Sequence, residues 1–206
     1  MNNQATSPSI LPFKFRILRS FKALDDGHRK KTIVIVAAED IPSNLPLDAN
    51  ARLPNVIKNK TCKEQRETLL QSPELFQILN SGIICTASNI HVSQEGNEQF
   101  IEVGFAQYTE GIVNGGHTYA TLLHVLHDNT SYSEGKDLKV VLEKDRDGGD
   151  PTFYDLMSND DTRIERIARA RKKAQVQMEI VAPIKDSELL AQIGRARNLS
   201  QGVELD

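Results

Sequence analysis

Tryptophan is absent from this chain of 206 residues, and aromatic residues make up only 5% of it. A broad surface of stacking aromatic side chains, on which single-stranded nucleic acids often bind, is therefore not expected. The two cysteines, Cys62 and Cys85, are too few for a disulfide scaffold or a zinc site made of cysteines alone. We expect both to be buried free thiols.

The chain also lacks a net positive charge and a long apolar run. Its formal net charge is −3 at pH 7, so nucleic-acid binding would need a local basic patch. No apolar stretch approaches the ~20 residues that cross a bilayer, and residues 1–9 lack the basic and apolar regions of a signal peptide. We expect a cytoplasmic protein without membrane association.

Strand and helix patterns alternate along the remainder of the chain. They predict an α+β fold, a mixed or antiparallel sheet with packed helices, in one domain over residues 11–206 after a disordered segment 1–10. The expected strands are 13–17, 31–37, 83–92, 99–108, 111–114, 138–142 and 176–181. The first two are expected to form an antiparallel pair, with turn residues at 25–28. The expected helices are 61–70, 73–79, 116–127, 162–174 and 186–197.

The helix at 73–79 follows Ser72, a candidate N-cap, and has Pro73 at its first position. Its buried face is expected to consist of four apolar side chains, Leu75, Phe76, Ile78 and Leu79. A left-handed cap at Asn80–Gly82 would end it.

The most informative segment is the glycine turn at residues 113–120, between an apolar strand and a helix. A helix N-terminus presents backbone N–H groups and a partial positive charge to an anion, and glycines allow close approach to the backbone. The candidate phosphate-binding residues are Asn114, Gly115, Gly116, His117 and Thr118. The alternative is a glycine turn that only connects a strand to a helix.

Two further groups are candidates for the same site. Asn80 precedes a strand that should pair near Asn114, although it also fits a structural helix cap. Arg197 and Asn198 end the last expected helix, where a cation also stabilises the helix without any ligand.

The helix expected at 162–174 carries many cations and few acids. Four of them, Arg163, Arg166, Arg169 and Lys173, are candidates for contact with a nucleic-acid backbone. The alternative is a solvated helix face beside the acidic loop 145–161. No metal site is predicted, because His124 and His127 share one side of a helix without a third ligand.

Four segments in order resemble motifs of the AIPR family, which is named for abortive phage infection. In chain order they are Pro73–Ile83, Val113–Thr118, Asp186–Leu189 and Arg197–Val203. His117, Ser81 and Arg197 depart from the family's usual Gln, Asn and Thr. Family members continue beyond the last of these motifs, so the chain is expected to be a short member or a fragment.

The turn at Gly115–Ala120 also resembles, more distantly, the loop of the ParB/sulfiredoxin-like superfamily that opens a helix and holds nucleotide phosphates. Thr118 occupies the place of that loop's arginine, so a cation from elsewhere, first of all Arg197, would have to supply the charge.

The resemblances imply an anti-phage protein of the abortive-infection type that binds a nucleotide or nucleic acid at 113–120. The alternative is an enzyme acting on nucleic acid or nucleotides, a nuclease or NTPase. A phage component or a second copy in a homo-oligomer stays open as a partner, and the sequence names no cofactor and no catalytic residue.

Overall fold

The computed structural model describes residues 9–47, 49–50, 53–106, 109–146, 150–183 and 192. Its eight strands in the described ranges are β1 (Ile10–Ile17), β2 (Arg19–Asp25), β3 (Lys30–Ala37), β4 (Ile83–Thr86), β5 (Asn89–Glu95), β6 (Glu98–Ala106), β7 (Gly111–Asn114) and β8 (Gln175–Ala182). The helices are α1 (Lys60–Gln71), α2 (Phe76–Leu79), α3 (Gly116–His127), α4 (Leu138–Asp145), α5 (Pro151–Ser158) and α6 (Asp160–Lys173). Two 3₁₀ turns, η1 (Ala38–Asp40) and η2 (Pro73–Leu75), complete the description.

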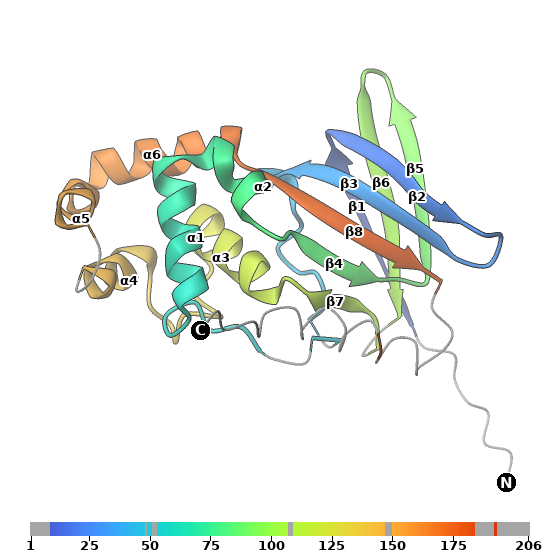
Figure 1. Cartoon of the computed structure of the whole chain (residues 1–206), viewed down its shortest axis with the longest axis horizontal. Coiled ribbons are helices and arrows are strands. Elements are labelled where there is room, and N and C mark those ends of the chain that lie inside the picture. Colours follow the sequence, from blue (N-terminus) through green and yellow to red (C-terminus); the bar gives the residue numbers. More distant parts are fainter. Residues whose placement is uncertain are drawn as a thin grey trace, which may run out of the picture.

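Helices gather on one side of the molecule and two sheets on the other (Figure 1). The smaller sheet is antiparallel, with the order β1-β6-β5, and the larger has the order β2-β3-β8-β4-β7. In the larger sheet β8 pairs antiparallel with β3 and parallel with β4. The fold is therefore α+β with one antiparallel and one mixed sheet, in agreement with the prediction.

Strand β8 alternates buried residues with exposed or half-buried ones along its whole length, the pattern of a strand with one face on the core. Its inward residues Val176, Met178 and Ile180 lie in one apolar cluster with Phe15 of β1 and Leu122 of α3. This cluster fixes the sheets and α3 relative to one another, so β7 ends and β4 begins beside the N-terminus of α3.

The predicted pairing of strand 13–17 with strand 31–37 is wrong. β1 pairs with β6, and the antiparallel partner of β3 in the hairpin is β2. The chain passes from one sheet to the other at Leu18, whose N–H donates to the Ile35 carbonyl at 2.8 Å. The hairpin turn itself lies where expected, with Gly27 at φ +81°.

The expected strand 83–92 is two strands in different sheets. β4 belongs to the larger sheet and β5 to the smaller one, and the chain changes sheet at Ala87 and Ser88. Both segments are apolar enough to read as one run, and the change of partner is a property of the tertiary fold alone.

The expected strand 138–142 is helical, as α4. The carboxylate of Asp137 accepts a hydrogen bond from the Val140 N–H at 2.8 Å and caps the helix. Val140 and Val141 favour a strand, but the cap and the burial of Val141 and Leu142 against the core prevail. α5 was not predicted at all.

The predicted buried face of helix 73–79 is also wrong. Phe76 is buried, but Ile78 and Leu79 are 77% and 69% exposed, and Leu75 is 43% exposed. The segment consists of η2 followed by the single turn of α2, which is too short to lay several side chains on the core. Pro73 occupies the first position of η2, the Ser72 side chain makes no capping bond, and the left-handed residue that follows α2 is Gly82.

Several predictions fall outside the described residues. They concern the helix at 186–197, with Arg197 and Asn198, and most of the segment 1–10.

The helix that follows Asn159 is confirmed as α6, two residues longer at its start than predicted. No helix in the described ranges is long and apolar enough to span a membrane.

Candidate functional site

The N-terminus of α3 opens at Gly115, which has left-handed backbone angles of φ +85° and ψ +16°. A Cβ atom at this position would collide with the Gly82 carbonyl oxygen and lie 2.8 Å from the Ile83 Cα. Glycine is therefore required both by the conformation and by the close approach of two backbones. The first i−4 hydrogen bond of the helix runs from the Tyr119 N–H to the Gly115 carbonyl at 2.9 Å.

Asn80 and Thr118 join the segment before β4 to the first turn of α3. The Asn80 Nδ2 lies 3.1 Å and its Oδ1 3.2 Å from the Thr118 hydroxyl. The same Oδ1 accepts from the Gly82 N–H at 2.8 Å, which holds the left-handed turn at Gly82 in place. The Gln65 Nε2 of α1 also donates to the Thr118 hydroxyl, at 3.2 Å.

Helix α1 forms the second wall through one polar stripe, Thr61, Glu64, Gln65 and Thr68. The spacing of these residues is i, i+3, i+4 and i+7, so they share one side of the helix. Asn59 caps the helix by accepting from the Cys62 N–H at 3.2 Å, and its Nδ2 lies 3.2 Å from the His117 Nε2. The cap of α1 and the first turn of α3 are thus in direct contact.

These elements enclose a pocket of about 360 Å³. Its walls include six of the residues that the sequence singles out: Asn80, Asn114, Gly115, Gly116, His117 and Thr118. The structure therefore brings together two predicted groups that are more than 30 residues apart in the chain. The described lining is completed by the stripe of α1 and by Asn50, Asn59, Phe76, Leu79, Ser81 and Gly82.

The loop after η1 closes the pocket near Gly116. A Cβ atom on Gly116 would lie 2.5 Å from the Asn50 Nδ2, so the Asn50 carboxamide lies against this glycine. Tyr119 anchors the loop: its hydroxyl accepts from the Leu45 N–H at 2.8 Å and donates to the Pro42 carbonyl at 2.9 Å. Burial raises the pKa of Tyr119, so it stays a neutral hydrogen-bonding group.

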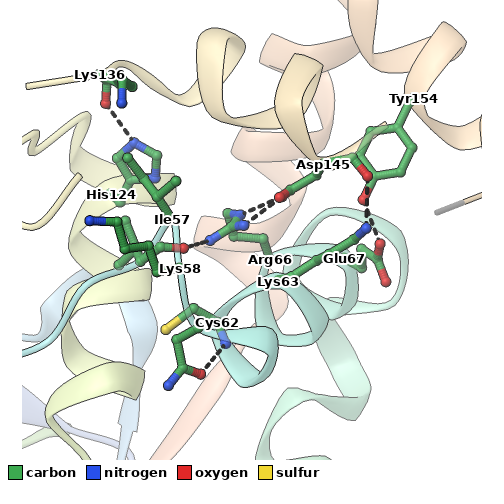
Figure 2. A network of polar contacts seen from close by, with 12 residues as sticks. Ile57, Lys58, Cys62, Lys63, Arg66, Glu67, His124, Lys136, Asp145 and Tyr154 are labelled. Carbon is green, nitrogen blue, oxygen red and sulfur yellow. Dashed lines mark hydrogen bonds and ion pairs between the residues drawn. The ribbon is translucent and has the colours of Figure 1, made fainter. Parts of the chain in front are cut away.

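The opposite side of α1 carries a buried polar network (Figure 2). The Arg66 guanidinium, with a side chain that is 0% exposed, bonds to the Asp145 carboxylate, at 3.1 Å from Nε, and to the Val56 carbonyl. Lys63 donates to the Asp145 carbonyl at 2.7 Å, and the Tyr154 hydroxyl donates to Glu67 at 2.6 Å. This network fixes α1 against α4 and α5 and leaves the polar stripe of α1 facing the pocket.

Both cysteines are buried free thiols, as predicted. Burial raises the pKa of the Cys62 thiol, and it raises that of Cys85 to about 12. Neither is a thiolate near neutral pH, so neither has the character of a nucleophile. Within the described ranges no group of three or more His, Cys, Asp or Glu residues is placed to hold a metal ion.

The candidate nucleic-acid residues of α6 make contacts with the protein itself. Arg163 bonds to Asp160 at 2.6 Å, Arg166 to the Leu70 carbonyl at 3.1 Å and Arg169 to Glu74 at 3.0 Å. Lys173 is exposed in the last turn of the helix. None of these four residues lines the pocket, so the structure does not bring them together with the glycine turn.

The pocket and the fold define a class of protein: an α+β domain with a polar pocket at a helix N-terminus. A family model described as AIPR protein matches residues 47–206, most of the chain, and the chain belongs to this family. All the described lining of the pocket lies inside the matched range, and β1 to β3 lie before it. No curated protein and no solved structure matches the chain, so the ParB/sulfiredoxin-like resemblance stays a prediction.

Sequence reasoning missed the wall formed by Asn59, Thr61, Glu64, Gln65 and Thr68. Their spacing is visible in the sequence, but a polar stripe on a helix is the ordinary pattern of a solvated face. A second signal lies in the structure alone: the Gln65 Oε1 is buried and has no hydrogen-bond partner among the described residues.

Proposed function

We propose that this protein acts in abortive-infection defence against phage by binding a phosphate-bearing ligand in the pocket at the N-terminus of α3. Family membership supports the defence role. The observation that supports the ligand site best is the pocket of about 360 Å³ in which Asn80–Gly82 and Asn114–Thr118 meet. Pockets of small ligands start at roughly 300 Å³.

The chemistry of this pocket is suited to one phosphate group. Twelve residues of α3 contribute the dipole whose positive end lies at Gly116, and the first turn of the helix contains no acidic residue. Gly115 and Gly116 line the pocket and have no side chain of their own over the backbone, although Gly116 is buried and the Asn50 carboxamide lies against it. The Thr118 hydroxyl and the Asn80 carboxamide are held in place by each other at the same point.

A binding role is favoured over a catalytic one by the groups that line the pocket. Its described lining has two titratable side chains, His117 and Glu64, on different helices, and no cluster of metal-ligating side chains lies among the described residues. The protein would then act by recognising its ligand and signalling that state to a partner.

Thermal unfolding in the presence of a panel of nucleotides and short DNA and RNA oligomers tests the proposal. At ligand concentrations about 100 times Kd, binding raises the free energy of unfolding by about 2.7 kcal/mol. Gly116→Glu, which adds bulk against Asn50 and a negative charge at the helix start, should abolish the shift. Gly27→Glu, in an open hairpin turn, is the control that should retain it. The proposal fails when no phosphate-bearing probe shifts the wild type, or when both variants respond alike; release of product from a labelled probe would establish an enzyme instead.

A further inference from the structure

The side chains that line the pocket among the described residues are almost all uncharged. Five carboxamides line it, from Asn50, Asn59, Gln65, Asn80 and Asn114. Glu64 is the one carboxylate of the described lining, which contains no lysine and no arginine. A carboxamide offers one acceptor and two donors, the combination that pairs with the edge of a nucleobase.

This lining is poorly suited to a polynucleotide backbone. Each phosphate of a bound strand is ordinarily neutralised by Lys or Arg, and the described walls supply none. The arginines of α6 that were candidates for this contact bond to Asp160, to Glu74 and to the Leu70 carbonyl. The helix dipole of α3 provides partial charge for one phosphate, and not for a chain of them.

An apolar surface and a carboxylate complete the set of groups that a nucleotide requires. Leu79 is 69% exposed at the pocket and Phe76 lies buried beside it, so a flat ring can be packed against this side. Glu64, whose side chain is 59% exposed and 3.8 Å from Lys60, lies on the α1 wall. A carboxylate at a nucleotide site accepts hydrogen bonds from ribose hydroxyls.

We infer that the pocket binds a single ribonucleotide rather than a nucleic-acid strand, recognising its base through carboxamides and its ribose through Glu64. The inference rests on the proposed function, because the phosphate of this ligand would lie at the α3 N-terminus. It assigns each chemical part of the ligand to a different wall: the base to Leu79 and the carboxamides, the ribose to α1, and the phosphate to Gly115 and Gly116.

Calorimetric titration of the wild-type chain with matched probes tests this assignment. The probes are the four ribonucleoside 5′-monophosphates, their 2′-deoxy forms, the four nucleosides, inorganic phosphate and a 12-nucleotide DNA. One of the four ribonucleotides should bind. Its nucleoside and its 2′-deoxy form should each bind about tenfold more weakly, which corresponds to about 1.4 kcal/mol of binding free energy. Inorganic phosphate and the DNA should show no saturable binding.

Glu64→Gln is the decisive variant, and Glu165→Gln, an exposed glutamate of α6, is its matched control. In Glu64→Gln the preference for the ribose form should disappear, whereas Glu165→Gln should keep it. A ribose preference that persists in Glu64→Gln would overturn the ribose contact, and tighter binding of both sugar forms by the same factor would show that Glu64 only repels the phosphate. Circular dichroism melting of each variant separates lost binding from lost folding.

The remaining outcomes distinguish the inference from the proposed function. Saturable, Gly116-dependent binding of the DNA or of inorganic phosphate without any mononucleotide binding overturns the inference and leaves the proposed function intact. Binding of a nucleoside with no gain from its phosphate overturns the proposed function. Absence of binding for every probe overturns both.

Discussion

Asn80 and Thr118 hold each other in the wall of the pocket, with the two ends of the carboxamide at 3.1 and 3.2 Å from the hydroxyl. Thr118 is 4% exposed, so water cannot readily replace this contact. Thr118→Val keeps the shape of the side chain and removes the hydroxyl. It should lower the free energy of unfolding by about 1 kcal/mol, measured by chemical denaturation.

Thr121, one turn further along α3, offers a matched control. Its Oγ1 is buried, and the polar group that faces it is the Cys62 thiol, a weak hydrogen-bonding partner. Thr121→Val should therefore change stability little, because it removes at most a weak contact with a thiol. Equal losses of stability in the two valine variants would contradict the role of the Asn80–Thr118 contact.

About half of the pocket can be predicted from the sequence, because that half is formed by interactions between residues close together in the chain. The turn at Gly115 and the cap at Asn80 are visible because a left-handed backbone and a capping carboxamide depend on neighbouring residues. The α1 wall is not visible, since Gln65 and Thr68 are part of a site only because α3 packs against α1. Neither residue type indicates in the sequence that α3 lies beside α1.

The errors in the fold have the same origin. β1 pairs with β6, in register from Ile10 with Ala106 to Ile17 with Gln99, across more than 80 intervening residues. Nothing in the hydrophobic pattern of 13–17 selects this partner over the nearer strand at 31–37. At 138–142 the β-branched pair Val140–Val141 favours a strand, but the Asp137 cap favours the helix that forms.

The Gly82–Gly115 approach gives a prediction about backbone strain. Gly115→Ala must adopt φ +85° and also push its Cβ into the Gly82 carbonyl oxygen. Gly27→Ala meets a similar angle, φ +81°, with nothing within 4 Å of its Cβ. We expect about 1 kcal/mol of destabilisation at Gly27 from the angle alone and about 3 kcal/mol or more at Gly115. Equal values would show that the close approach relaxes without cost.

The ion pair between Arg66 and Asp145 is buried, with 0% and 9% side-chain exposure. Arg66→Met leaves the carboxylate with one fewer partner in a buried place and should lower the free energy of unfolding by about 3–5 kcal/mol. The double variant with Asp145→Leu should lose less than the sum of the single ones. Arg146–Asp155, 60% exposed on both sides, is the control pair, and Arg146→Met should have little effect. Additive losses at Arg66 and Asp145 would show that they do not act as a pair.

His124 makes the stability of the fold depend on pH. It is 0% exposed, its Nε2 lies 3.1 Å from the Lys136 carbonyl, and its Nδ1 is buried without a partner among the described residues. Burial lowers its pKa in the folded protein, against a smaller opposing effect of the Lys136 carbonyl. Burial likewise lowers the pKa of His127, the last residue of α3.

The direction of the pH effect follows from which state takes up the proton first. Unfolded histidine titrates at about 6.5, so below this pH the unfolded chain is protonated while folded His124 stays neutral until its lower pKa is reached. Stability is therefore full above about pH 6.5 and falls as the pH decreases from there towards the folded pKa. Urea denaturation at intervals between pH 8 and 5 measures this slope. In His124→Gln the dependence of stability on pH should become shallower, with the remaining slope due to His127. His28→Gln, in the exposed hairpin turn, is the control and should keep the wild-type slope. An unchanged slope in His124→Gln would rule out the burial of neutral His124 as the cause.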